Sequence, residues 1–250
     1  MMKAIVCKKF GDLSQINFER VQKPDCGAND ILIGVRIATV SFMDWLMTDG
    51  GYQLKPTLPY VPGTDASGIV ISVGKNVTRF AQGDRVACST WYGAYAEVMA
   101  APESACYHVP DGVSDLDAAN IIYSYGSAHY GLIGRAGLIT GETLLVTGAT
   151  GGVGLAAVEV GKLLGARVIA GVGSERKRNL AMSYGADAVI NYSNEDLRQR
   201  IKELTNGEGI DVCFEMIGGV IFEKLARSMN WNGRLLPIGF ASGDIPSIPM

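Results

Sequence analysis

The residues with the clearest chemical meaning lie in the segment 147–154, which is rich in glycine and follows an apolar run ending at Val146. A helical pattern begins directly after it, so the segment reads as a turn between a strand and a helix. Such a turn lets backbone N–H groups approach a diphosphate, and the positive end of the helix favours its negative charge. The spacing of Ala149, Gly151 and Gly154 places alanine at the first glycine of the dinucleotide fingerprint. We therefore expect nucleotide binding here, with a purely structural turn as the alternative.

The end of the next expected strand carries the residues that distinguish NADPH from NADH. Enzymes that prefer NAD place an acidic residue about twenty residues beyond the glycine turn. Here the strand runs into Ser174, and Glu175 follows one residue later. Ser174 is the expected helix N-cap, and Lys177 and Arg178 fall in the first helical turn, where a phosphate also meets free N–H groups. The pattern favours the 2′-phosphate of NADPH; the alternative is a basic, solvated helix face.

Composition and charge limit the classes to which the chain can belong. Its 250 residues are 48% hydrophobic, enough for one large domain or two modest ones. The 22 Lys and Arg against 25 Asp and Glu leave a net charge of −3, which provides no basic surface for nucleic acid or an anionic membrane. The sequence shows neither a secretory signal nor a membrane span, and its five cysteines form no CxxC pair. We expect a cytoplasmic protein with reduced, buried thiols, binding no nucleic acid and no membrane.

Short strands joined by turns fill the first part of the chain. Apolar residues alternate over 31–37, the segment 67–73 ends at a turn over 74–76, and a further strand covers 85–88. Strands at this spacing predict a closed or partly closed β-barrel-type domain.

The pattern changes after residues 110–113. Ser114 is expected to cap a helix, with Asp117 three residues later completing the cap. Strands and helices then alternate, and the alternation predicts an α/β domain with a doubly wound parallel sheet. The strands are expected at 144–147, 167–172, 188–192, 212–216 and 234–239. We place the two domains at residues 1–121 and 122–250; since such a sheet normally has six strands, we expect its C-terminal part to be absent from this chain.

Eight motifs occur together in one order: residues 59–68, Gly74, 83–86, 93–97, 151–154, 185–187, 190–192 and 239–243. In these motifs the chain resembles the zinc-free quinone oxidoreductase, or ζ-crystallin-like, branch of the medium-chain dehydrogenase/reductase superfamily. The resemblance implies a GroES-like domain followed by a Rossmann domain, with the active site in the cleft between them. It also implies NADPH as the cofactor, and a homodimer if the missing sheet strand is present.

The resemblance also assigns cofactor-binding residues. It puts the diphosphate on the turn, near Ala149 and on Gly151, Gly152, Val153 and Gly154. The 2′-phosphate is expected near Ser174, Lys177 and Tyr192, and the nicotinamide between Ser127 on one side and Gly239 with Phe240 on the other.

No metal is expected in this branch. In zinc-dependent relatives a cysteine occupies the position of Ser41 and a histidine that of Thr64, and neither residue present here is a plausible zinc ligand. The four-cysteine run of their structural zinc lobe has no counterpart between Cys88 and Cys106.

Without a metal, hydride must go to an acceptor that already spreads negative charge, such as a quinone. The candidate catalytic residues are Tyr52, Ser41 and Asp44. Tyr52 matches the proposed proton donor of enoyl-thioester reductases in the superfamily, its alternative role being that of an apolar cleft wall. Since the family commonly has asparagine at Ser41 and glutamate at Asp65, the acceptor preference stays open.

The function implied is that of an NADPH:quinone oxidoreductase acting on a small-molecule acceptor by direct hydride transfer. Two alternatives stay open: a reductase of 2-enoyl thioesters or other activated alkenes, and a non-catalytic NADPH-binding protein.

Overall fold

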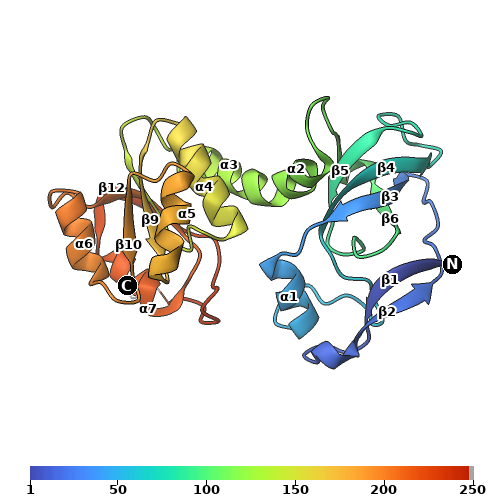
Figure 1. Cartoon of the computed structure of the whole chain (residues 1–250), viewed down its shortest axis with the longest axis horizontal. Coiled ribbons are helices and arrows are strands. Elements are labelled where there is room, and N and C mark those ends of the chain that lie inside the picture. The colour runs from blue at the N-terminus through green and yellow to red at the C-terminus, as the bar shows by residue number, and fades with distance from the viewer. Residues whose placement is uncertain (248–250) are drawn as a thin grey trace. The chain divides into compact units, whose positions relative to one another are not determined.

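The computed structural model describes residues 1–247 and divides into two compact units, Met1–Tyr123 and the part from Ser124 onward. The first unit is mostly β-structure, whereas the second alternates strands and helices (Figure 1).

The first unit contains an antiparallel five-stranded sheet and a separate two-stranded hairpin. The sheet has the order β6 (Val98–Pro102), β3 (Asp30–Ala38), β4 (Asp65–Val73), β5 (Arg85–Ser89) and β7 (Cys106–His108). The hairpin pairs β1 (Met2–Cys7) with β2 (Ile16–Val21), and the helix α1 (Phe42–Asp49) connects β3 with β4 along the chain. Ile31 and Ile33 of β3 are fully buried with Val86 of β5, so the expected period-two pattern faces the core.

The expected helix after residues 110–113 is confirmed. The backbone N–H of Asp117 donates to the Ser114 hydroxyl at 3.1 Å, and α2 (Asp115–Asn120) begins there. Helical backbone continues through π turns at Ile121–Tyr125 and Tyr130–Arg135 on either side of α3 (Gly126–His129).

The second unit is the expected doubly wound sheet, with five parallel strands among the residues described. Their order is β10 (Ala188–Asn191), β9 (Arg167–Val172), β8 (Thr143–Val146), β11 (Ile210–Glu215) and β12 (Met229–Pro237). Numbered along the chain this order is 3-2-1-4-5, so the direction of winding reverses between β8 and β11.

Helices cover both faces of this sheet. One face packs against α4 (Gly152–Leu163) and α5 (Arg178–Ser183), the other against α6 (Leu197–Leu204) and α7 (Gly219–Ala226). Neighbouring residues of β8 therefore enter different cores: Leu145 lies with α6 and α7, and Val146 with α4. Burial on both sides explains why these strands read as continuous apolar runs.

Two element boundaries differ from the sequence prediction by more than two residues. Helix α4 begins at Gly152 instead of residue 155, because glycine is tolerated in the first turn of a helix. Strand β12 begins at Met229 instead of residue 234. Its pairing with β11 shifts between Ile210 and Val212, and Asn232 has a φ of 61°, so a strand containing this irregularity reads locally as a turn.

The cysteines are all free thiols. Cys7, Cys88, Cys106 and Cys213 are buried, as expected for small apolar side chains, and Cys26 is half-buried. Within residues 1–247, no helix has both the length and the apolar character that a membrane crossing requires.

Candidate functional site

The glycine turn has the geometry of a phosphate cradle. Gly148 adopts a φ of +58°, and a Cβ on Gly154 would lie 2.3 Å from the Gly148 carbonyl oxygen. Only glycine at position 154 therefore lets α4 approach the turn this closely. The first three amides of α4, at Gly152, Val153 and Gly154, lack acceptors within the helix, and no side chain of Gly151 caps them.

Ala149 differs from the other residues of the turn. It is fully buried, and its N–H donates to the Gly171 carbonyl at 3.1 Å. The residue therefore joins the turn to β9 and has no amide left for a ligand. Likewise the N–H of Gly151 donates to the Gly148 carbonyl at 2.9 Å, leaving the amides of α4 as the donors that a diphosphate would meet.

A buried hydroxyl without a partner lies at the end of β9. Ser174 stands at the predicted N-cap position, with φ −162° and ψ 151°, but its side chain does not cap the following turn. The Oγ atom is buried and has no hydrogen-bond partner among residues 1–247. Such a group costs free energy unless a ligand or water satisfies it. Lys177 lies one turn further on, exposed and without an ion pair in the described chain.

The two charged neighbours of Lys177 are already paired. Arg178 Nε lies 2.5 Å from the Glu175 carboxylate, and a second nitrogen lies 3.3 Å from Glu195. The hydrogen bond from Arg178 holds the pKa of Glu175 below its ordinary value. Glu175 is thus committed to Arg178, which removes it as an acidic partner for a ribose 2′-hydroxyl.

Tyr192, the third residue predicted near the 2′-phosphate, follows β10. A Cβ on Gly173 would lie 3.4 Å from the Tyr192 hydroxyl, so the Tyr192 ring lies beside the backbone that leads into Ser174. Burial, and then the charge of Glu215, raise the pKa of Tyr192, which therefore stays a neutral hydrogen-bond donor. The structure brings Tyr192 and Ser174 together.

A buried carboxylate that the sequence analysis missed lies where the sheet reverses direction. Glu215 ends β11, is fully buried, and accepts hydrogen bonds from the Thr147 hydroxyl at 3.0 Å and from the N–H groups of Ile217 and Gly218. Thr147 follows β8, the neighbouring strand. Burial raises the pKa of Glu215, and these donors oppose the rise. The signal for this pair was a polar residue at the end of each of two central strands.

The predicted nicotinamide residues fall into two groups. Ser127 lines a pocket of about 680 Å³ together with the last residues of β12 and with Ile238, which follows that strand. Gly239 donates its N–H to the Glu215 carbonyl at 3.3 Å, and Phe240 packs against Gly218, so both lie at the β11 end. They do not line the Ser127 pocket.

An aromatic pocket of about 660 Å³ lies within the first unit. Tyr52 lines it together with Met43, Trp91 and Tyr123, and its ring centroid lies 6.5 Å from that of Trp91. No residue among 1–247 bonds to the Tyr52 hydroxyl, which therefore has free capacity to donate to a ligand.

Two buried carboxyl groups lie in the same unit. Asp44 forms a capping box with Ser41 at the start of α1, and its Oδ2 also accepts from the Tyr95 hydroxyl at 2.9 Å. Asp65, at the start of β4, accepts from the Thr64 hydroxyl at 2.8 Å. The Oδ1 atom of each aspartate is buried without a partner in the described chain.

Two of these contacts involve Ser41 and Thr64, the positions at which the resemblance implies zinc ligands in zinc-dependent dehydrogenases. Ser41 and Thr64 offer hydroxyl groups, and both are engaged by aspartates. Zinc prefers thiolate and imidazole ligands, so the donor set does not suit it. Within residues 1–247 no group of three or more His, Cys, Asp and Glu is arranged to hold a metal ion.

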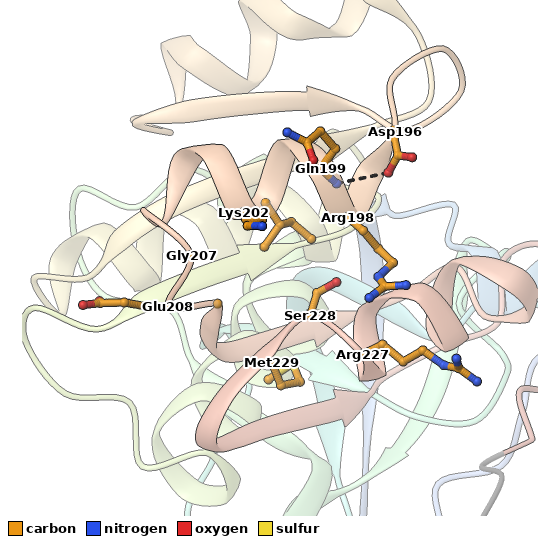
Figure 2. Close-up of a pocket in the computed structure, with 11 residues that line it drawn as sticks. Asp196, Arg198, Gln199, Lys202, Gly207, Glu208, Arg227, Ser228 and Met229 are labelled. Carbon is orange, nitrogen blue, oxygen red and sulfur yellow. Dashed lines mark hydrogen bonds between the residues drawn. The ribbon is translucent and has the colours of Figure 1, made fainter.

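A further pocket, of about 360 Å³, is formed by α6, the loop after it and residues 227–229 (Figure 2). Arg198, Lys202 and Arg227 line it together with Asp196 and Glu208, so its charge is mixed. None of the residues predicted from the sequence lies there.

Comparison with known proteins agrees with this architecture. Residues 27–111 match the family model of the alcohol dehydrogenase GroES-like domain, and residues 152–250 match that of the zinc-binding dehydrogenases. A quinone oxidoreductase-like protein 2 homolog of Nematostella vectensis is 38% identical over 252 residues, covering 99% of this chain and 68% of the relative. The chain belongs to the medium-chain dehydrogenase/reductase superfamily, in its quinone oxidoreductase branch.

Solved structures of this branch are similar along the whole chain. A quinone oxidoreductase of Pseudomonas syringae is 31% identical with a TM-score of 0.93, over 100% of this chain and 77% of the other. The Escherichia coli quinone oxidoreductase, solved in complex with NADPH, is 29% identical with a TM-score of 0.89, over 99% and 76%.

Proposed function

We propose that this chain transfers hydride from NADPH to a quinone or a similar conjugated carbonyl compound. The observation that carries the proposal is the buried, unpartnered Ser174 hydroxyl beside the free Lys177, at the end of the strand that follows the glycine cradle. A 2′-phosphate satisfies both groups, whereas the hydroxyl of NADH leaves the lysine charge unpaired. The NADPH complex of the similar E. coli enzyme supports this choice of cofactor.

In this proposal residues 122–250 hold NADPH. The amides of Gly152, Val153 and Gly154 bind its diphosphate, where the helix dipole adds to the attraction. Tyr192 joins Ser174 and Lys177 at the 2′-phosphate, while Ser127, Gly239 and Phe240 flank the nicotinamide. When bound, NADPH supplies the hydride. The protein supplies orientation and a site from which water is excluded.

The first unit, Met1–Tyr123, binds the acceptor in this proposal. The aromatic walls of the Tyr52 pocket suit a flat, conjugated ring, because such rings stack favourably. Negative charge grows on the acceptor oxygen as hydride arrives, and the unpaired Tyr52 hydroxyl donates a hydrogen bond to it. Ser41 and Asp44 act by fixing the first turn of α1, from which Met43 reaches the pocket.

The test compares the rate of NADPH oxidation by a 1,4-quinone with that by a crotonyl thioester, before and after Tyr52→Phe. We expect the quinone to be the better acceptor. Loss of one hydrogen bond should lower kcat/KM for the quinone about tenfold in Tyr52→Phe.

Other outcomes identify the alternatives. A chain that reduces the thioester and leaves the quinone untouched is an enoyl reductase, with Tyr52 as its acid. A chain that binds NADPH at micromolar concentration and reduces neither acceptor is a binding protein.

A further inference from the structure

Asp65 and Ser89 lie directly opposite each other on neighbouring antiparallel strands. In the register of β4 with β5 they are Cα partners at the ends of the two strands. Side chains of such partners project from the same face of the sheet, with Cβ atoms about 5 Å apart. The Ser89 hydroxyl accordingly lies close enough to the Asp65 carboxyl group to oppose the rise in its pKa that burial causes.

The Asp65 carboxyl group is placed to hold a proton. It is fully buried, and only one of its oxygens accepts a hydrogen bond from Thr64. Its Oδ1 has no partner among residues 1–247, and Asp44 is the nearest negative charge acting on it. A carboxylate in this position loses hydration and is repelled by Asp44, and protonation relieves both costs.

Ser89 connects this buried acid with the acceptor pocket. Asp65 is shielded from solvent, but Ser89 is half-buried and lines the 660 Å³ pocket together with Tyr52 and Tyr123. Burial, and then the charges of Asp65 and Asp44, raise the pKa of Tyr123, which lines the same pocket. One hydroxyl group therefore separates a buried carboxylic acid from the space that the acceptor fills.

We propose that Asp65 and Ser89 form a two-residue relay that delivers the proton needed to complete reduction of a quinone. The proposal rests on the proposed quinone reduction. NADPH supplies two electrons with the hydride, leaving the acceptor as a hydroquinone anion. Ser89 gives its hydroxyl proton to the anionic oxygen and takes the proton of the Asp65 carboxylic acid. Asp65 is left as a carboxylate and regains a proton from solvent, through Ser89 and the open pocket, before the next turnover.

The other titratable groups facing Asp65 do not compete with it near neutral pH. Burial, the largest cause, raises the pKa of Asp65 to about 6. Burial raises the pKa of Tyr123 to about 12, and burial with the Asp44 charge raises that of Tyr95. Contact with Cys106, then burial, raises the pKa of Cys88 well above its ordinary value. These three groups stay protonated in the range in which Asp65 titrates.

The arginines of β3 and β5 form ion pairs with a carboxylate other than Asp65. Arg36 of β3 and Arg85 of β5 both pair with Asp115 of α2, at 3.0 Å and 2.8 Å. Among residues 1–247, no cation is one of the groups that shift the pKa of Asp65.

The experiment measures quinone-dependent NADPH oxidation between about pH 5 and pH 8. For the wild type we expect kcat/KM for the quinone to fall as the pH rises through about 6. Asp65→Asn, which keeps the acceptor oxygen for Thr64, should lower the value about 100-fold at low pH and remove the inflection. Ser89→Ala should do the same, and Ser89→Thr, which keeps the hydroxyl, should restore both rate and inflection.

A second variant separates Asp65 from Asp44. Asp44→Asn removes the charge that raises the pKa of Asp65, so the inflection should move to lower pH and persist. A readout independent of turnover is the infrared band of the protonated carboxylic acid, which should disappear in Asp65→Asn and, in the wild type, above about pH 6.

The relay is wrong if the inflection survives in Asp65→Asn or in Ser89→Ala while these variants still reduce quinones. A different result would refute the proposed function itself: a wild-type chain that reduces no quinone at any pH. That result would refute the relay as well.

Discussion

Cofactor choice depends on a few side chains at the end of β9. Among residues 1–247, the buried Ser174 hydroxyl has no hydrogen-bond partner and Lys177 has no ion pair, whereas Arg178 pairs with Glu175 and Glu195. In the sequence Lys177 and Arg178 both fall in the first helical turn, and the family resemblance selected Lys177 for the 2′-phosphate. Their difference comes from Glu195, whose approach to Arg178 depends on how β10 and α6 pack.

Lys177→Ala should weaken NADPH binding and leave NADH binding nearly unchanged. A charge-assisted hydrogen bond contributes about 1.5–3 kcal/mol, so the dissociation constant for NADPH should rise roughly ten- to hundred-fold. Quenching of protein fluorescence during titration measures both constants. Lys202→Ala, on the exposed side of α6, is the matched control and should change neither. An equal loss for both cofactors in Lys177→Ala would remove the 2′-phosphate assignment.

The elements were predictable wherever a local pattern defines them. The helix cap at Ser114, the period-two strand β3 and the alternation of β8 to β12 with helices follow from neighbouring residues. The start of β12 was missed because its irregular register depends on pairing with β11.

The candidate site was only partly predictable for the same reason. Tyr52 and the glycine turn belong to local motifs. The partnerships of Asp65 with Ser89 and of Thr147 with Glu215 join strands distant in sequence, so the sequence shows polar residues at strand ends but not which of these residues pair.

Gly151, the N-cap of α4, and Gly154, in the first turn of that helix, should respond differently to the same substitution. In Gly154→Ala the new Cβ lies 2.3 Å from the Gly148 carbonyl oxygen, and we expect unfolding free energy to fall by about 1–3 kcal/mol. In Gly151→Ala the new Cβ lies 3.5 Å from the Gly148 carbonyl oxygen, and the φ of residue 151 is −81°. The free energy of unfolding should therefore change by less than about 1 kcal/mol. Urea denaturation of both variants checks this. Equal stability of the two would mean that the turn is more open than the structure shows.

For the whole molecule, the buried acid of the first unit makes stability depend on pH. The pKa of Asp65 is about 6 in the folded chain, against an ordinary value of 3.8. Below the ordinary value the group is protonated in both states. As the pH rises through about 6, the folded chain must bury a charge and loses stability.

Asp65→Asn should therefore gain stability relative to the wild type as the pH increases from about 4 to 7. A shift of about two units corresponds to about 3 kcal/mol. Urea denaturation of both proteins at the two pH values measures the difference in free energy of unfolding between them. Any part of this difference that does not depend on pH cancels when the two pH values are compared. The same stability difference at both pH values would show that Asp65 titrates normally in the folded protein.

In the proposed reaction the unit from Ser124 onward holds NADPH and the unit Met1–Tyr123 binds the acceptor. The most direct test measures reduction of one 1,4-quinone by the 250-residue chain with NADPH and, in parallel, with NADH. We predict turnover with both cofactors and a kcat/KM for NADPH at least about tenfold higher. Equal values for the two cofactors, or no quinone-dependent oxidation of NADPH, would contradict the account.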